Sequence, residues 1–259
     1  SLSRFRRILL VRFSLAMRRR RRGALFERCF SPRTLTHTLT HHHLLLLLRS
    51  TCTAKDIFVG SNSNGVLHRA LLRFDLSNAS WLRPESIIDA RVRLFVNRIS
   101  GGTGGHPTDL FELVRLEQPW GPSENVTAHY PHPGESAGGS LRPARPGEPT
   151  WTVPRLGRPT SWINAGADPG TDARSAAIRP ARQASTWDVT MMSSAPTLIA
   201  DVRRWLRDEA TNYGWLLRGD QTTEGRSGTV RAYASALGDP LTDVPVLELI
   251  WSPDGRVTT

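Results

Sequence analysis

The sequence predicts a mostly β protein: an antiparallel β-sandwich or jelly roll with one amphipathic helix. Several short runs alternate apolar and polar residues at a period of two, which is typical of half-buried strands. Residues that favour turns separate these runs, and only one segment shows the apolar spacing of a helix. Many short strands with little helix point to two packed antiparallel sheets.

Three alternating runs lie in the first half of the chain, at residues 69–76, 87–96 and 110–116. Each run places its apolar side chains on one face, as a strand does when one side of the sheet is buried. The positions expected to face the core are Leu72, Phe74 and Leu76 in the first run, Ala90, Val92, Leu94 and Val96 in the second, and Leu110, Val114 and Leu116 in the third.

Residues 117–186 contain clusters of Pro and Gly, which predicts an irregular excursion with short strand pieces near Trp151 and Trp162. A strand at 187–190 follows. The helix comes next, with Pro196 near its first turn and an apolar stripe at a helical period. The stripe consists of Leu198, Ile199, Val202, Trp205 and Leu206. Further strands are expected at 215–217, 229–234 and 245–251.

The net charge of +11 is confined to the first fifth of the chain. Residues 1–50 hold twelve Arg and a single acid, Glu27, so they account for all of the excess charge. The remaining 209 residues are neutral overall. Because affinity for phosphates needs a concentrated basic face, this argues against a dedicated nucleic-acid-binding domain. The longest apolar run, Leu44 to Leu48, is too short to predict a membrane span.

Residues 1–53 are expected to form an Arg-rich leader, disordered or non-native, ahead of a folded unit at 54–252 and a short tail at 253–259. No regular period persists in the leader. Its composition suits an organelle transit peptide, and a start at Met17 would also allow a poor secretory signal. Translated upstream or out-of-frame sequence is a third interpretation. Both cysteines, Cys29 and Cys52, fall in this leader, so no disulfide framework is predicted in the body.

The folded unit resembles the DNRLRE-domain family of secreted proteins, which is similar to a family of alginate-binding carbohydrate-binding modules. The matching segments are RALLRFDLS at 69–77, IIDARVRL at 87–94, EQPWG at 117–121, WDVT at 187–190, IADVRRWL at 199–206, NYGWLL at 212–217 and PVLEL at 245–249. Their order and spacing, rather than any single segment, make the resemblance specific.

This resemblance implies a β-jelly-roll module without catalytic activity, extracellular or at the cell surface, often fused to or associated with other domains. It implies no cofactor, although a structural calcium ion is possible. The family usually has an additional opening strand before a segment like Phe58-Val-Gly-Ser61, and here the leader stands in its place. Loss of that strand would expose a sheet edge. If the leader is a transit peptide, an organelle is the alternative location.

The expected function is carbohydrate binding, with an acidic polysaccharide as one candidate partner. Aromatic residues outside any periodic pattern suggest where a sugar would stack, and neighbouring Arg residues would supply charge. These candidates are Tyr130, Trp151 and Trp162, with Arg142, Arg145 and Arg155. Alternatively, these tryptophans simply cover the sandwich. A structural or adhesive surface domain without a glycan ligand is the other functional hypothesis.

Gly134-Glu-Ser136-Ala-Gly138 fits the G-x-S-x-G pattern of a hydrolase nucleophile, but that motif requires a turn between a buried strand and a helix. The prolines on both sides disfavour such a turn, so a hydrolase is not expected. No zinc, phosphate-loop or EF-hand motif is present in the sequence. Asp75, within the first alternating run, could face solvent, bind backbone groups or bind calcium at a sheet corner, and a structural role is the favoured interpretation.

Overall fold

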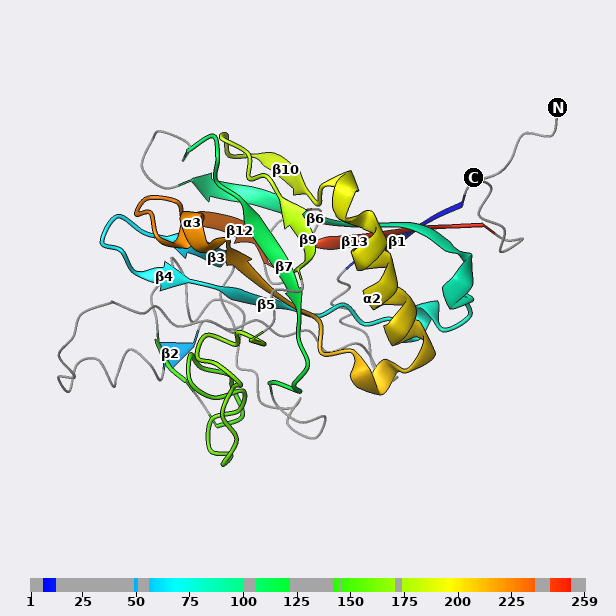
Figure 1. Cartoon of the computed structure of the whole chain (residues 1–259), viewed down its shortest axis with the longest axis horizontal. Coiled ribbons are helices and arrows are strands. Elements are labelled where there is room, and N and C mark those ends of the chain that lie inside the picture. The colour runs from blue at the N-terminus through cyan, green and yellow to red at the C-terminus, as the bar shows by residue number, and fades with distance from the viewer. Residues whose placement is uncertain are drawn as a thin grey trace.

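The computed structural model describes residues 7–12, 49–50, 56–99, 106–121, 142–144, 146–170, 174–235 and 243–252. Over these residues the protein is mostly β, with two main antiparallel sheets packed face to face (Figure 1), which confirms the predicted class. The larger sheet contains β1 (Arg7–Arg12), β3 (Asp56–Ser61), β4 (Leu67–His68), β6 (Ile87–Ile99), β10 (Thr186–Val189), β12 (Arg231–Ala234) and β13 (Val246–Trp251). The smaller sheet contains β5 (Ala70–Leu72), β7 (Phe111–Arg115), β9 (Arg174–Ile178) and β11 (Trp215–Gly219).

Two short strands, β2 (Arg49–Ser50) and β8 (Arg142–Pro143), pair separately. Short 3-10 turns at Ser77–Ala79, Pro84–Ser86, Met192–Ser194 and Glu209–Thr211 join the main elements. Predicted Asp75 binding to the backbone is confirmed, because its carboxylate accepts a hydrogen bond from the Ser77 amide at 2.8 Å, next to the first of these turns. The described residues also contain a short helix of four residues, α3 (Gln221–Glu224). Its N-cap is Asp220.

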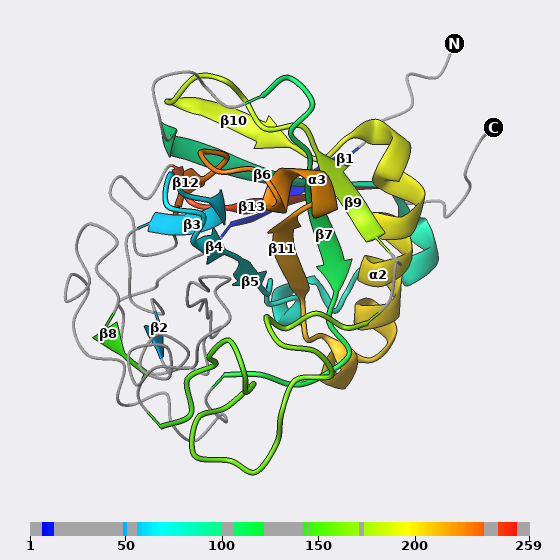
Figure 2. The same cartoon turned by 60° about the vertical axis from the view of Figure 1, so that its left-hand side comes forward.

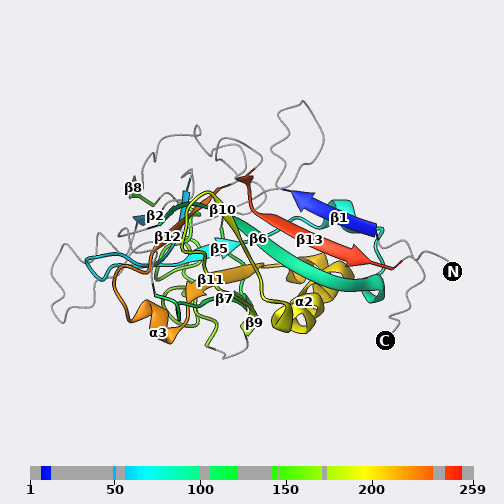
Figure 3. The ribbon, with the colours of Figure 1, turned by 90° about the horizontal axis from the view of Figure 1, so that it is seen from above.

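The long strand β6 organises the larger sheet. Arg93 pairs with both β10 and β13, and Val96 pairs with both β10 and β12. One residue cannot pair with two strands on the same side, so β10 occupies one side of β6. Strands β12 and β13 share the other side, one after the other along its length (Figure 3). Strand β3 then pairs with β12, and β1 pairs with β13.

The expectation that residues 1–53 stay outside the folded unit is wrong for residues 7–12. This segment forms β1, which pairs antiparallel with all six positions of β13, from Arg7 opposite Trp251 to Arg12 opposite Val246. The physical reason is that β13 pairs with β6 along only one side and would otherwise leave a row of unpaired backbone groups. The leader therefore contributes an edge strand rather than leaving the sheet edge open.

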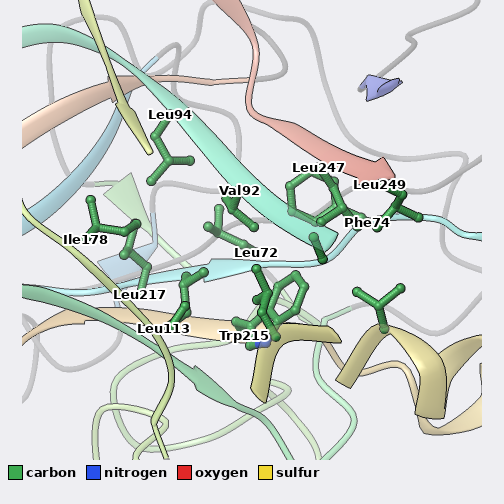
Figure 4. Close-up of a cluster of buried hydrophobic side chains, with 14 of the residues drawn as sticks. Leu72, Phe74, Val92, Leu94, Leu113, Ile178, Trp215, Leu217, Leu247 and Leu249 are labelled. Carbon is green, nitrogen blue, oxygen red and sulfur yellow. The ribbon is translucent and has the colours of Figure 1, made fainter. Parts of the chain in front are cut away.

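The main core lies between the inner faces of the two sheets (Figure 4). Val92, Leu94, Leu247 and Leu249 from the larger sheet meet side chains from the smaller one. The residues from the smaller sheet include Leu72, Leu113, Ile178, Trp215 and Leu217, all fully or almost fully buried. The apolar sides predicted for the runs at 69–76 and 87–96 therefore face this core. The prediction for the run at 110–116 is wrong, because this strand is apolar on both sides: Phe111 and Leu113 face the core, whereas Val114 and Leu116 pack in a second cluster on the outer side of the smaller sheet.

The predicted helix is α2 (Ala195–Arg207), which closes one end of the sandwich beside β6 and β9. Leu198, Val202 and Trp205 are buried, and the ring of Trp205 packs edge-to-face on Trp215 with ring centres 4.5 Å apart. The helix also places the Asp201 carboxylate where it accepts a hydrogen bond from the Trp215 indole at 2.8 Å. The 3.6-residue apolar stripe thus anchors the helix between the two sheets.

The excursion predicted as irregular forms a third layer. Residues 146–170 lie over the outer face of the smaller sheet, and Figure 2 shows this loop in green on the far side of β5, β11 and β7 from β10. Leu71, Val114 and Leu216 point outward from their strands yet are buried under it. The smaller sheet is consequently buried on both faces.

Candidate functional site

Two of the aromatic residues predicted to stack on a sugar do not lie on the surface. Trp151 is 3% exposed and Trp162 is 5% exposed, and both belong to the second hydrophobic cluster beneath the loop at 146–170. Their prediction as exposed stacking residues is therefore corrected: they cover the sandwich. The reason is that the outward side of β5, β7 and β11 is apolar, and these indoles are the side chains that shield it from water.

Specific contacts hold both indoles in place. The Trp162 indole donates a hydrogen bond to the carbonyl of Thr150 at 2.8 Å. The guanidinium of Arg69 lies 5.2 Å from the ring centre of Trp151, within the range of a cation–π contact. Trp120 completes the cluster, and its indole donates to the carbonyl of Tyr213 at 2.6 Å. These contacts indicate that the three tryptophans have a structural role.

The other predicted site residues are only partly described. Tyr130 and Arg145 lie outside the described residues, as does Ser136 of the hydrolase-like motif. Arg142 is described only as a backbone position of β8. Arg155 is partly buried, and its Nε donates a hydrogen bond to the carbonyl of Gly121 at 2.6 Å, which ties the loop to the end of the segment after β7. The structure therefore describes the side chains of only three of the six predicted residues, and two of these, Trp151 and Trp162, are buried.

The rest of the smaller sheet's outer face is occupied by a ladder of ion pairs. Arg69 makes a two-pronged contact with Glu224, with both hydrogen bonds at 2.7 Å. Asp168, from the loop, contacts the guanidinium groups of Arg218 and Arg69. The ladder continues from Arg218 through Glu112 to Arg174. These charges pair with one another, and Asp168 of the loop contacts two of the arginines.

The outer face of the larger sheet has a different character. In β6 the residues that point away from the core are Asp89, Arg91, Arg93, Phe95 and Asn97. Opposite Phe95 stands Trp187 of β10, and the two rings pack edge-to-face with centres 5.2 Å apart. The guanidinium of Arg93 lies 4.7 Å from the Trp187 ring centre. Trp187 is half-buried rather than part of the core.

A second aromatic group lies farther across the same face, on β3 and β4. Phe58 points outward between the buried Ile57 and Val59, and its ring centre is 6.0 Å from that of His68. The guanidinium of Arg98 lies 5.6 Å from the Phe58 ring centre. Each aromatic group therefore has an arginine beside it. We call Phe58, His68, Phe95 and Trp187, together with the outward polar residues of β3, β6 and β13, the outer aromatic face.

Polar side chains surround these rings in fixed positions. Arg98 pairs with Asp56 at 2.6 Å, and the Asn97 amide donates to the same carboxylate at 2.8 Å. Arg93 pairs with Glu248 of β13 at 2.7 Å. These pairs leave carboxylate oxygens, guanidinium hydrogens and an amide beside the aromatic rings. The arrangement suits a ligand with both apolar faces and hydroxyl groups.

Burial lowers the pKa of His68 from its usual value to about 4, because a charged imidazole would lose its hydration there. His68 is thus neutral at pH 7.

Inside the sandwich, Asp188 accepts a hydrogen bond from the Tyr233 hydroxyl at 2.7 Å. Burial raises the pKa of both groups. Because this pair lies among core residues, we regard it as structural.

The sequence also contains a signal for the outer aromatic face. The alternation in β6 that places Val92, Leu94 and Val96 inward also places Arg93 and Phe95 outward. A large aromatic residue on the charged side of an amphipathic strand indicates a packing or binding role for that side. The same applies to Trp187. Only the pairing of β10 with β6 shows that the two rings meet.

Among the described residues, no cluster of three or more His, Cys, Asp or Glu side chains could hold a metal ion. Within the same ranges, no helix is both long and apolar enough to cross a membrane. No model of a known protein family matches the chain, and a comparison with curated proteins also finds no match.

Proposed function

We propose that this chain is a non-catalytic carbohydrate-binding β-sandwich and that the outer aromatic face binds the sugar. The observation that carries the proposal is the pairing of aromatic rings with arginine, amide and carboxylate groups across the outer side of the larger sheet. The pyranose ring of a sugar presents C–H groups on its faces and hydroxyls around its edge. Aromatic rings accommodate the former and fixed polar groups the latter.

A comparison of the outer faces of the two sheets supports the larger sheet as the side that binds the sugar. The outer face of the smaller sheet is covered by the loop at 146–170 and by the ion-pair ladder. Phe58, His68, Phe95 and Trp187 are instead half-buried at the outside of the larger sheet. An extended polysaccharide suits such a sheet face, because successive sugar units can follow neighbouring strands. Binding there needs no large cavity.

The proposed setting is extracellular or at the cell surface, with the module attached to or associated with other domains. It rests on the resemblance to DNRLRE-domain proteins in segments such as 69–77 and 199–206. These segments also carry structural roles, since Phe74 and Trp205 are core residues. The resemblance therefore bears on the kind of fold and its setting, and the binding proposal stands on the outer aromatic face.

The proposal can be tested with the full chain by affinity electrophoresis through gels containing soluble polysaccharides. Trp187→Ala should abolish retardation, and Trp187→Tyr should restore part of it. Trp81→Ala is the matched control, because Trp81 is 59% exposed and packs on Trp251 with ring centres 5.4 Å apart, outside the proposed face. Near-ultraviolet circular dichroism confirms that each variant is folded.

Equal retardation of the Trp187→Ala variant and the wild type would remove the outer aromatic face as the site. Failure of the wild type to bind any polysaccharide in the panel would reject carbohydrate binding. That outcome would favour the alternative of a structural or adhesive domain without a glycan ligand.

A further inference from the structure

Among its described side chains, the outer aromatic face carries no net charge. Three arginines point outward from β6, and each is paired with one carboxylate. Arg91 pairs with Asp89 at 2.7 Å, Arg93 with Glu248 at 2.7 Å and Arg98 with Asp56 at 2.6 Å. The only other titratable group named on this face, His68, is neutral at pH 7 because its pKa lies at about 4. Positive and negative groups therefore balance across the face.

The carboxylates of these pairs are more buried than the guanidinium groups. The side chains of Asp56, Asp89 and Glu248 are 16%, 20% and 18% exposed, whereas that of Arg98 is 57% exposed. Asp56 is fixed from two sides, by Arg98 and by the Asn97 amide. A ligand on this face would thus meet fixed negative groups close to every arginine.

This arrangement opposes an acidic polysaccharide. Each uronate carboxylate would have to compete with a protein carboxylate for a guanidinium that is already paired, and it would be repelled by that carboxylate. A neutral face also supplies no long-range attraction to a polyanion. Uncharged hydroxyl groups face neither penalty, since they donate to carboxylates and accept from the remaining guanidinium hydrogens.

We infer that the ligand of the outer aromatic face is an uncharged polysaccharide rather than the acidic one that the sequence suggested. This inference rests on the proposed carbohydrate-binding function and narrows it to a class of ligand. The Arg-rich residues 1–50, which include β1 at the edge of the same sheet, carry a charge of +11 and can attract polyanions without Trp187.

The test compares polysaccharides that share a backbone and differ in the charge it carries: linear mannan with polymannuronate, and fully methyl-esterified polygalacturonate with polygalacturonate. Titrations use the full chain and its Trp187→Ala variant, and only affinity lost in the variant is assigned to the face. We expect this Trp187-dependent binding for a neutral polymer, unchanged between about 50 mM and about 500 mM NaCl, because screening acts on charges alone. The matching polyuronate should bind at least about tenfold more weakly through Trp187.

A charge variant gives a second, positive readout. Glu248→Gln leaves Arg93 without its carboxylate partner and makes the face positive. It should create Trp187-dependent, salt-sensitive binding of the polyuronate. Glu85→Gln is the control, since Glu85 is 66% exposed and pairs with Arg207 of α2 rather than with the face.

The possible outcomes distinguish the uncharged-ligand inference from the proposed carbohydrate-binding function. Trp187-dependent binding of a polyuronate as tight as that of its neutral partner would overturn the uncharged-ligand inference while supporting carbohydrate binding. A polyuronate affinity that stays unchanged in Glu248→Gln would also count against the charge argument. No Trp187-dependent binding of any polymer would reject the proposed function itself.

Discussion

Replacing Trp151 with alanine should destabilise the protein strongly, although this residue lies in a loop rich in Pro and Gly. Its side chain is 3% exposed and packs with Trp120, Trp162 and Leu216 over the smaller sheet. Truncating a buried Trp typically costs about 3–5 kcal/mol in unfolding free energy. Loss of the Arg69 contact, at 5.2 Å from the ring centre, adds up to about 1–2 kcal/mol.

Partial collapse of the loop at 146–170 into the vacated space would offset some of this loss, so we expect a net decrease of about 3–5 kcal/mol. For a protein of this size, that corresponds to a drop in Tm of roughly 10 °C. Urea denaturation followed by circular dichroism measures the free energy directly. It should show a lower midpoint with an unchanged slope, because the fold itself is retained.

The matched control is Trp81→Ala. Trp81 is 59% exposed, so its removal should cost less than about 1 kcal/mol. If the two variants had the same urea midpoint, Trp151 would not be anchoring the third layer. Its earlier interpretation as an exposed binding residue would then regain support.

Two further predictions concern the leader and the histidine of the outer aromatic face. Deleting residues 1–12 removes β1 and leaves six ladder positions of β13 unpaired, so Tm should fall and concentration-dependent association should appear in light scattering. Deleting residues 1–6 alone is the control, and identical melting of both truncated chains would contradict the pairing. Because the pKa of His68 is about 4 in the folded chain, below its unfolded value, the unfolded state takes up more protons between pH 6.5 and pH 4. The free energy of unfolding should therefore fall as pH falls through this window. His68→Gln should reduce this pH dependence, whereas substitution of the exposed His106 with Gln should leave it intact. Equal pH profiles for the two variants would refute the role of His68.

Much of the fold could be read from local patterns. The alternation of Val92, Leu94 and Val96 predicted which side of β6 faces the core, and the stripe containing Val202 and Trp205 predicted α2. These predictions succeeded because a strand and a helix expose their faces at fixed periods, so a partly buried element records its inner side in the sequence. Asn212-Tyr-Gly214 also separates the helical region from β11. Gly214 has φ +74, and a Cβ there would clash with the Leu72 carbonyl.

The candidate site was harder to predict. Trp151 and Trp162 were assigned to a surface because no periodic pattern accounted for them, whereas each fills an apolar area on a sheet far away in sequence. A clue was present in Ala70–Leu72 and Trp215–Leu217, which are apolar at consecutive positions. Such runs indicate strands buried on both faces, and a second cover was therefore needed.

The sequence by itself determined the β class, the inward sides of the runs at 69–76 and 87–96, the main helix and the confinement of excess charge to residues 1–50. The tertiary structure alone decided how the outer face of the smaller sheet is covered. It placed the tryptophan loop on the smaller sheet, β1 on the edge of β13, and Trp187 opposite Phe95. The physical reason is that periodicity records whether a side chain is buried or exposed, while contacts between segments distant in sequence depend on how the whole sandwich packs.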